Sequence, residues 1–241
     1  MHLLNGDCLE LMKGISDNSV DMVLCDLPYG TTACKWDIII PFEELWNQYN
    51  RIIKDNGAIV LFSAQPFTTK LIASNLKYFR YCWYWKKNKA NGFTYARFQP
   101  MRNIEDICVF YKRAPVYNPQ GLIKLDKPKI KHKRACKDTT YTLNKKEATI
   151  VSYYTNYPKH LLEFSSDVTN NKNRLHPTQK PVELLEYLIK TYTNEGDIVL
   201  DNCMGSGSTG VACWNTKRRF IGIELNEKYF NIAKNRINSI Q

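Results

Sequence analysis

Short apolar runs alternate along this chain with stretches in which apolar residues recur every three or four positions. Runs of the first kind are typical of buried strands, and the second spacing is typical of helices that bury one face. In the first half, the pattern predicts strands over 20–25, 58–62, 81–85 and 106–111, and helices over 42–54 and about 66–76. The Asn56-Gly57 pair is expected to stop the first of these helices.

The same alternation returns towards the carboxyl end. There the pattern predicts strands over 197–200 and 219–223 and helices over about 181–192 and about 226–238. A further helix is predicted to follow the glycine-rich run at 205–210 and to end at about 216. Strands that alternate with helices indicate an α/β fold with a doubly wound, mostly parallel sheet. The predicted strands include 20–25, which ends at Asp26, and 197–200, which ends at Asp201.

Between 113 and 173 the periodicity fades, and four prolines interrupt the segment. A segment this long is not an ordinary connection, so we interpret it as a functional insert. The chain is therefore expected to form one domain from residues 1–112 and 174–241, interrupted by an inserted region over 113–173.

The composition narrows the class of protein. A chain of 241 residues, 44% of them hydrophobic, can bury a real core. No run approaches the roughly 18 consecutive apolar residues of a membrane span. The segment Met1–Asp7 lacks the features of a secretory signal. We expect a cytoplasmic protein without a membrane partner.

The eight cysteines are scattered, no two are separated by only two residues, and no His lies close to them. This spacing does not favour a metal site, and disulfides are not expected in a cytosolic chain. Most of these cysteines are expected to act as small buried hydrophobic residues.

The formal net charge of +11 is concentrated in one part of the chain. Residues 77–146 hold about 18 Lys or Arg against 4 Asp or Glu, while the remainder is slightly acidic. An ordinary solvated face is the alternative, but one basic segment between near-neutral flanks favours a nucleic-acid surface. The candidate phosphate-binding residues are Lys86, Lys87, Lys89, Lys129, Lys131, Lys133 and Arg134.

A glycine loop follows the predicted strand that ends at Asp201. Gly205 and Gly207 allow the backbone to approach a ligand at the turn into the next helix. About twenty residues later, Glu224 ends the next predicted strand, where a carboxylate can accept hydrogen bonds from both ribose hydroxyls. This unit is typical of adenosine binding, and the absence of a GxxxxGK[ST] loop disfavours ATP hydrolysis.

A second candidate site, Asp26-Leu27-Pro28-Tyr29, follows the predicted strand over 20–25. Asp26 can accept a hydrogen bond from an amino group, and Pro28 makes Leu27 extended, so that a main-chain carbonyl can face the same group. Tyr29 could stack on a base. The alternative is a turn that merely ends the strand.

Four motifs, in order, resemble those of amino-group DNA methyltransferases. Asp26–Tyr29 resembles their (D/N/S)PP(Y/F) motif, and the DNCMGSG run at 201–207 resembles their DPFxGSG loop. The HPTQKP run at 176–181 and the Gly6-Asp7-Cys8 segment resemble further elements. The order resembles the β class of this N6-adenine/N4-cytosine family, which implies a Rossmann-like fold, S-adenosylmethionine as cofactor and a target-recognition insert.

The resemblance also implies roles for individual residues. The cofactor-binding residues would be Asp7, Cys8, Thr178, Lys180, Asp201, Gly205, Gly207 and Glu224. Asp7 and the backbone at Cys8 would lie near the adenine ring, and Glu224 on the ribose. Thr178 and Lys180 would lie near the methionine end, where Lys180 could pair with the carboxylate.

Two departures from the family pattern stand out. Leu27 replaces the usual first proline, which is compatible with a role for its carbonyl alone. Asn202-Cys203 replaces Pro-Phe, so an aromatic wall of the cofactor pocket is either absent or supplied elsewhere. In the family an acidic first residue usually accompanies adenine, so Asp26 favours N6-methyladenine, with N4-methylcytosine as the alternative.

The resemblance implies methyl transfer to a flipped-out base by direct attack of its amine on the sulfonium methyl group. Double-stranded DNA is the expected partner, and a homodimer and a cognate restriction endonuclease are possible further partners. Two other readings stay open. One is a methyltransferase for RNA or a small amine, and the other is a catalytically silent DNA-binding module.

Overall fold

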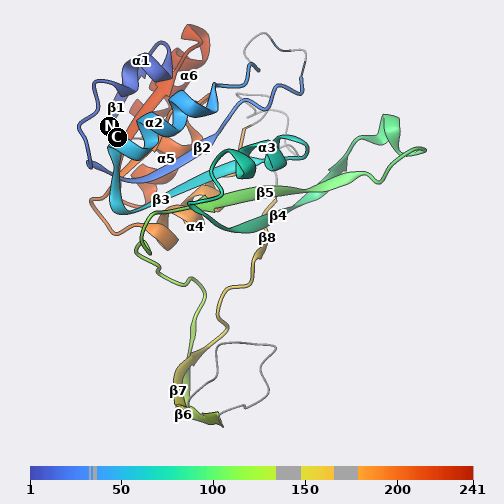
Figure 1. Cartoon of the computed structure of the whole chain (residues 1–241), viewed down its shortest axis with the longest axis vertical. Coiled ribbons are helices and arrows are strands. Elements are labelled where there is room, and N and C mark those ends of the chain that lie inside the picture. The colour runs from blue at the N-terminus through green and yellow to red at the C-terminus, as the bar shows by residue number, and fades with distance from the viewer. Residues whose placement is uncertain (33, 35–36, 134–147, 166–178, 241) are drawn as a thin grey trace. The chain divides into compact units, whose positions relative to one another are not determined.

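The computed structural model describes residues 1–32, 34, 37–133, 148–165 and 179–240. It divides into two compact units. The first joins Met1–Asn118 to His160–Gln241, and the second is Pro119–Lys159. The second unit falls inside the segment 113–173, whose lack of periodicity indicated an insert (Figure 1).

The first unit contains one eight-stranded sheet and six helices among its described residues. Its strands are β1 (His2–Asn5), β2 (Val20–Asp26), β3 (Ile53–Ser63), β4 (Phe79–Asn91), β5 (Arg102–Phe110), β8 (Leu161–Glu163), β9 (Ile198–Asp201) and β10 (Arg219–Glu224). Its helices are α1 (Cys8–Met12), α2 (Phe42–Ile52), α3 (Phe67–Ser74), α4 (Val182–Tyr192), α5 (Ser208–Asn215) and α6 (Glu227–Asn238). Over the described residues, no helix is long and apolar enough to cross a membrane.

The strand order is β1-β10-β9-β2-β3-β5-β4-β8. The strands from β1 to β3 in this order are mutually parallel, and β5 is antiparallel to both of its neighbours. From the centre, the chain winds outward through β3 on one side and through β10 on the other. The doubly wound, mostly parallel and Rossmann-like sheet expected from the sequence is confirmed.

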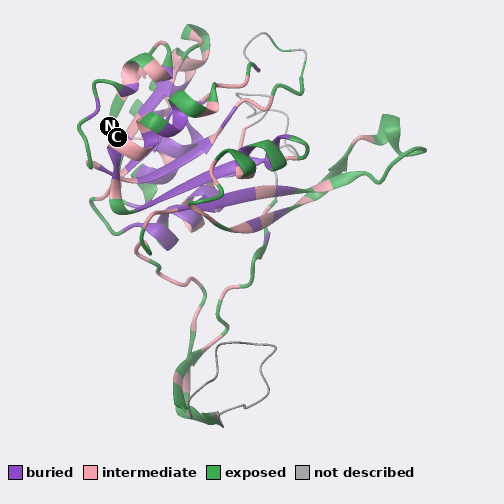
Figure 2. Cartoon of the chain, viewed as in Figure 1, coloured by how far each residue is buried: buried purple, intermediate pink, exposed green. Residues whose placement is uncertain are grey.

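Alternate residues of the central strands enter two separate cores. Met22 and Leu24 of β2 pack with α4, α5 and α6, whereas Val23 and Cys25 pack with α1, α2 and α3. Both faces of the sheet are therefore covered, as Figure 2 shows by its buried centre. This explains why β2 and β9 read as continuous apolar runs rather than alternating ones.

Strand β3 begins earlier than its apolar run predicts. Helix α2 ends at Ile52, and Ile53 already pairs with Val20 of β2. The register then shifts, so that Ala58 pairs with Met22. The intervening residues bulge around Gly57, where a Cβ would lie 2.9 Å from the carbonyl oxygen of Asp21. The Asn56-Gly57 pair therefore serves a close backbone approach within a strand, rather than a helix stop.

Strands β4 and β5 are also longer than predicted. Beyond Lys86 and Asp106, the two strands pair only with each other and form a long hairpin (Figure 1). The hairpin carries Phe93 and Phe98 at its tip, and these side chains are 81% and 86% exposed. A two-stranded ribbon without a buried face has no apolar alternation, which is why the sequence pattern missed its length.

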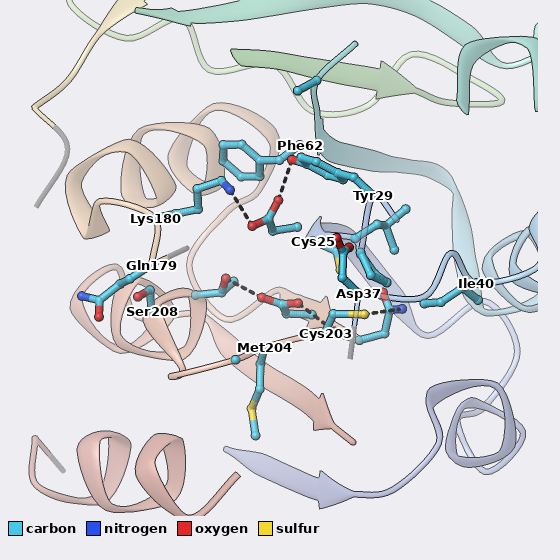
Figure 3. Close-up of a pocket in the computed structure, with 18 of the residues that line it drawn as sticks. Cys25, Tyr29, Asp37, Ile40, Phe62, Gln179, Lys180, Cys203, Met204 and Ser208 are labelled. Atoms are coloured by element: carbon cyan, nitrogen blue, oxygen red, sulfur yellow. Dashed lines mark hydrogen bonds and ion pairs between the residues drawn. The ribbon is translucent and has the colours of Figure 1, made fainter. Parts of the chain in front are cut away.

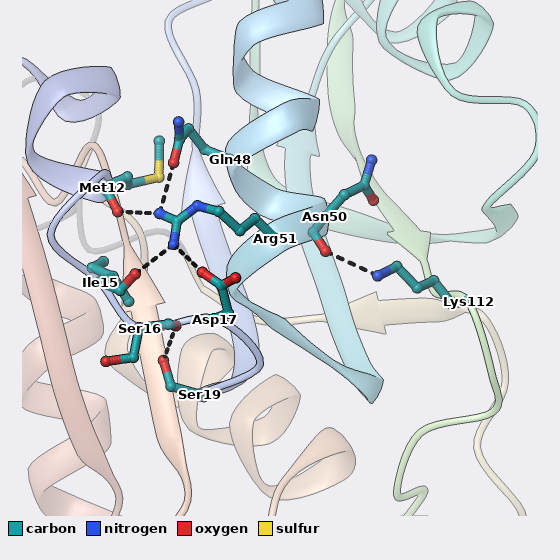
Figure 4. A network of polar contacts seen from close by, with 9 residues as sticks. All are labelled: Met12, Ile15, Ser16, Asp17, Ser19, Gln48, Asn50, Arg51 and Lys112. Carbon is teal, nitrogen blue, oxygen red and sulfur yellow. Dashed lines mark hydrogen bonds and ion pairs between the residues drawn. The ribbon is translucent and has the colours of Figure 1, made fainter.

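Arg51 fixes the loop that leads into β2 (Figure 4). Its guanidinium donates to the carbonyl oxygens of Met12 and Ile15, each at 2.7 Å, and to the carboxylate of Asp17. The side chain of Gln48, one turn earlier on α2, accepts a fourth bond at 2.9 Å. One half-buried arginine thus joins α1, α2 and the loop that leads into the central strand.

The second unit contains the antiparallel pair of β6 (Ile123–Lys133) and β7 (Ala148–Thr155). Many of its large apolar side chains are exposed, including Ile130, Tyr153 and Tyr157. A two-stranded unit has little core of its own. Packing within this unit therefore does not explain its exposed aromatic side chains.

We expect Gly207→Ala to destabilise the first unit. Gly207 precedes α5 with φ of 79°, and a Cβ there would lie 3.0 Å from the Cβ of Ala233 and 3.2 Å from its Cα on α6. Backbone strain and crowding together should lower the free energy of unfolding by about 1–3 kcal/mol. Urea unfolding measures this change. Gly14→Ala is the control, because a Cβ there would make only an ordinary contact, 3.5 Å from the Leu11 carbonyl oxygen, and its φ is not positive. Equal losses of stability in the two variants would contradict the argument.

Candidate active site

The candidate site lies where two adjacent parallel strands end. β2 pairs with β9, with Val23 opposite Leu200, so that Asp26 and Asp201 reach the same edge of the sheet. A cavity of about 810 Å³ opens there and is lined by both carboxylates, by Glu224 and by the intervening loops. Its size suits a nucleotide-sized ligand together with a reacting group. The structure therefore brings the two candidate motifs of the sequence into one space.

The glycine loop is tied to Glu224. The backbone N–H of Gly205 donates to one carboxylate oxygen of Glu224 at 2.9 Å, and that of Asn226 donates to the other at 2.9 Å. Burial nevertheless raises the pKa of this carboxyl above its usual range, because desolvation outweighs the two N–H bonds. Each oxygen retains a lone pair, so Glu224 can accept further hydrogen bonds from a ligand in the cavity.

Asp201 is almost completely buried beneath the loop. Its carboxylate accepts the Thr209 hydroxyl at 2.6 Å and the backbone N–H of Cys203 at 3.1 Å. Burial raises the pKa of Asp201 to about 6, although both bonds act in the opposite direction. Asp201 therefore holds the loop against the start of α5, in addition to lining the cavity.

The Asn202-Cys203 departure has a structural explanation. Asn202 is 2% exposed and accepts the hydroxyl of Tyr49 at 2.6 Å, while Cys203 lines the cavity. A buried polar contact thus occupies the position of the family's proline, and Cys203 occupies the position of its aromatic residue. Aromatic surface in the cavity comes instead from other elements, namely Tyr29, Phe62, Trp85 and Tyr229.

The amino-terminal segment completes this wall. Asp7 caps α1 by accepting the backbone N–H groups of Leu9 and Glu10 at 2.8 and 3.2 Å, and both Asp7 and Cys8 line the cavity. Thr178 lies outside the described residues. The roles of these residues towards a cofactor stay predictions.

The Asp26 motif forms the opposite part of the cavity. One oxygen of Asp26 accepts the Tyr29 hydroxyl at 2.7 Å, and the Tyr29 ring stacks on Phe67 with centroids 5.0 Å apart. Leu27 is 4% exposed, and both Leu27 and Pro28 line the cavity. The tetrapeptide is therefore held by packing on α3 and by an internal hydrogen bond.

Lys180 lines the cavity beside the Asp26 motif. Its ammonium lies 2.5 Å from Asp26 and 3.0 Å from Glu105, and 5.0 Å from the centre of the Phe62 ring. Figure 3 places Lys180, Phe62 and Tyr29 together on one wall of the cavity. Pairing of Lys180 with a methionine carboxylate stays a prediction, because in this structure two protein carboxylates hold its charge.

These buried charges compensate each other. Lys87 lies 2.6 Å from Glu105, so Asp26, Lys180, Glu105 and Lys87 alternate in sign. Burial lowers the pKa of Lys180, but the two carboxylates outweigh it and raise that pKa above its usual value. Burial acts to raise the pKa of Glu105, yet Lys180 and Lys87 lower it to about 2. Burial, together with the charge of Glu105, raises the pKa of Asp26.

Asp37 holds the loop that follows the tetrapeptide. Its carboxylate accepts three backbone N–H groups, from Gly30 at 2.8 Å, Thr31 at 2.9 Å and Thr32 at 2.7 Å. Burial opposes ionisation, but hydrogen bonds from the loop prevail and lower the pKa of Asp37. Asp37 therefore stays charged and anchors the cavity rim beside Tyr29.

The candidate phosphate-binding lysines occupy two places. On β4, Lys86 is exposed and pairs with Glu163 at 3.0 Å, Lys87 pairs with Glu105, and Lys89 lines the cavity. On β6, the side chains of Lys129 and Lys131 are exposed. Lys133 ends β6, and Arg134 lies outside the described residues. The charge of Lys87 is thus committed to the site, and the other described lysines stay predictions for DNA.

Sequence reasoning missed two acidic residues of the site. Glu105 lies inside a strand of the hairpin, and Asp37 lies seven residues beyond Gly30 in a segment without periodicity. One signal for Glu105 was available. It shares a face of β5 with Ile107 and Val109, so the alternation of the strand predicts that its carboxylate is buried. Among the described residues, no three His, Cys, Asp or Glu side chains gather as metal ligands.

The stability of the chain should depend on the ionisation of Asp201. Its folded pKa of about 6 exceeds the ordinary value of 3.8, so the folded state binds this proton more tightly than the unfolded chain. The contribution of Asp201 to the free energy of unfolding therefore falls by about 3 kcal/mol as pH rises from about 4 to about 7. In urea unfolding, the free energy of unfolding of Asp201→Asn should rise relative to that of wild type as pH increases across this range. A difference that does not change with pH would exclude the raised pKa of Asp201.

Comparison with known proteins places the chain in a family. A family model described as DNA methylase (N6_N4_Mtase) matches residues 20–235. The chain is 29% identical over 253 residues to the Type II methyltransferase M.HpaI of Haemophilus parainfluenzae, covering 98% of this chain and 74% of that protein. It is 28% identical to the DNA adenine methyltransferase YhdJ of Escherichia coli (strain K12), covering 98% and 82%.

A solved structure agrees with this assignment. The crystal structure of the M1.HpyAVI–SAM complex is similar with a TM-score of 0.68 and 25% identity, over 98% of both chains. The sequence motifs had indicated the same family, and that prediction is confirmed. With the family model covering most of its length, this chain belongs to the N6/N4 DNA methylase family.

Proposed function

We propose that this protein transfers a methyl group from S-adenosylmethionine to N6 of an adenine flipped out of duplex DNA. The observation that carries the proposal is the single cavity shared by Asp26 and Glu224. Asp26 can accept a hydrogen bond from an amino group, and Glu224 can accept hydrogen bonds from the hydroxyls of a ribose. The adenine assignment is supported by Asp26 as the first residue of its motif and by the similarity to a protein named as an adenine methyltransferase.

The residues that face the cavity fit an adenosyl cofactor. Gly205 lines the cavity, and Glu224 keeps acceptor capacity on both oxygens. Gly207 is not among the residues that line the cavity and lies against Ala233 of α6, so its role towards a cofactor stays a prediction. Asp7 and Cys8 add a polar and an apolar group beside it. S-adenosylmethionine, when bound, supplies a sulfonium methyl group that an amine attacks directly.

The other half of the cavity would hold the base. Asp26 would accept one amino hydrogen and the carbonyl of Leu27 the other, which directs the nitrogen lone pair out of conjugation with the ring. Tyr29 would provide an aromatic face for the base. After transfer the nitrogen must lose a proton, and the Asp26 carboxylate is the acceptor nearest to it. Positioning and exclusion of water would supply most of the rate enhancement.

Two surfaces suit the duplex. The hairpin of β4 and β5 begins at the cavity wall with Lys89 and Arg102 and ends in the exposed Phe93 and Phe98. The second unit, Pro119–Lys159, presents lysines and aromatic side chains on β6 and β7. Phosphate contacts would position the enzyme, and base readout is proposed to lie in the second unit. A homodimer, a cognate restriction endonuclease and a cytoplasmic location stay predictions.

Asp26→Ala should abolish methyl transfer without preventing DNA binding. The substitution removes the acceptor that grips the amine, whereas the basic surfaces are unchanged. Transfer of label from radioactive S-adenosylmethionine to duplex DNA measures activity, and fluorescence anisotropy measures binding. If the variant methylates DNA as well as wild type, Asp26 is not the catalytic carboxylate.

The identity of the product tests the base. Digestion of methylated DNA and chromatography of the nucleosides should give N6-methyladenine. N4-methylcytosine instead would establish the alternative amino-group reaction. Labelled RNA or a small amine, without labelled DNA, would exclude a DNA substrate. Binding of DNA without any transfer under all of these conditions would favour a silent DNA-binding module.

Replacing Lys129 and Lys131 together by Ala should weaken DNA binding in a salt-dependent way. Each phosphate contact contributes a slope of about −0.9 to the logarithm of the binding constant against the logarithm of salt concentration. Loss of both contacts should reduce the steepness by about 2. The control replaces Lys13 and Lys217, which pair with Glu10 and Glu195 on the first unit. Equal slopes for the two double variants would remove β6 from the interface.

A further inference from the structure

Both oxygens of Asp26 already accept a hydrogen bond. Lys180 donates to one oxygen at 2.5 Å, and the Tyr29 hydroxyl donates to the other at 2.7 Å. A substrate amine needs one of these same oxygens. Each oxygen keeps a second lone pair, but the charged Lys180 donor at 2.5 Å already draws on this acceptor. Asp26 therefore holds the amine most strongly when that donor moves to another acceptor.

Glu105 lies within reach of both donors. Its Oε1 atom is 3.0 Å from the Lys180 ammonium and 3.2 Å from the Tyr29 hydroxyl. Its other oxygen is 2.6 Å from Lys87, which keeps the carboxylate in place and ionised. The side chain of Glu105 is about 6% exposed, so water does not compete effectively for this contact.

We propose that Glu105 is a positioning residue that receives Lys180 and the Tyr29 hydroxyl when a substrate amine binds Asp26. This inference rests on the function proposed above. The carboxylates would exchange donors over a short distance, since both donors lie between them. Asp26 would gain acceptor capacity for the amine, and no buried cation or hydroxyl would lose its last partner.

The energetic reason is the cost of an unpaired buried charge. Removing one partner of a buried ion pair is strongly destabilising, because the remaining charge is uncompensated. Without Glu105, Lys180 could leave Asp26 only at such a cost, and the amine would compete with an ammonium for the same oxygen. With Glu105, the ammonium keeps a carboxylate in both arrangements.

A purely structural ion pair would not need this geometry. Lys87 alone already neutralises Glu105, at a shorter distance than Lys180 does. The oxygen of Glu105 that Lys87 does not contact is the one that faces the two donors of Asp26. One oxygen of Glu105 is therefore held by Lys87, and the other faces the two groups that donate to Asp26.

The first experiment compares Glu105→Gln with wild type. The amide keeps the size of the side chain but loses the negative charge that pairs with the Lys180 ammonium. We therefore expect kcat to fall by about 10- to 100-fold. KM for DNA and the dissociation constant for S-adenosylmethionine should change little, because neither ligand is bound by Glu105. Asp21→Asn is the matched control. Asp21 forms a partly buried pair with Lys54 at 2.6 Å at the far end of β2, and its loss should leave kcat unchanged.

The second experiment is a double-mutant cycle with Lys180→Gln. Once the ammonium is gone, Glu105→Gln should have a smaller further effect on kcat, since only the Tyr29 hydroxyl is left to exchange. Independent, multiplicative losses would show that Glu105 does not act through Lys180. Thermal unfolding checks each variant. Glu105→Asp, which keeps the charge but withdraws the oxygen, replaces Glu105→Gln if the amide fails to fold.

The outcomes separate this inference from the proposed function. If wild type methylates DNA, Asp26→Ala does not, and folded Glu105→Gln and Glu105→Asp match wild type in kcat, then the positioning role is excluded while the function stands. If wild type methylates no DNA, the proposed function itself fails. A lower kcat at unchanged KM, together with non-additivity in the cycle, supports the exchange.

Discussion

The pairing of β2 with β9 is the contact on which the rest of the site depends. These strands leave the centre of the sheet in opposite winding directions, so the loops that follow them diverge and leave a space between them. Asp26 ends one strand and Asp201 the other, and each is followed by a loop that an acidic side chain holds. Asp37 anchors the first loop through three N–H groups, and Glu224 anchors the second through the N–H of Gly205.

Burial is the second constraint, and it works differently at the two strand ends. Asp201 lies among neutral donors, so desolvation dominates and raises its pKa. Around Asp26 the charges alternate, and each ion is stabilised by a neighbour of opposite sign. Such a row of charges tolerates rearrangement, because an ammonium that moves from one carboxylate to another leaves the number of ion pairs unchanged. Asp201 has no such alternative and keeps its loop in one position.

Much of the site could be predicted because an acidic residue directly after an apolar run marks the end of a strand. Asp26, Asp201 and Glu224 each close an apolar run, so their place at one sheet edge follows from the winding rule. Glu105 could not be found in this way, because it lies within a strand and its function depends on two residues that are distant in sequence. The bulge at Gly57 was misread as a helix stop, since glycine marks both features. The insert carries few buried residues, and without a core the periodicity that reveals strands is absent.

The insert leaves the first unit at Asn118 and returns at His160. At the departure point the chain is tied down, because the backbone N–H of Asn118 donates to Thr191 at 2.8 Å and its side chain donates to Thr193 at 3.2 Å. Since the sheet is complete without the intervening residues, recombination could exchange that segment for another of different length without rebuilding the catalytic core. With base readout in that segment, as proposed above, lineages of such enzymes would diversify in the DNA sequences that they recognise faster than in the chemistry that they perform.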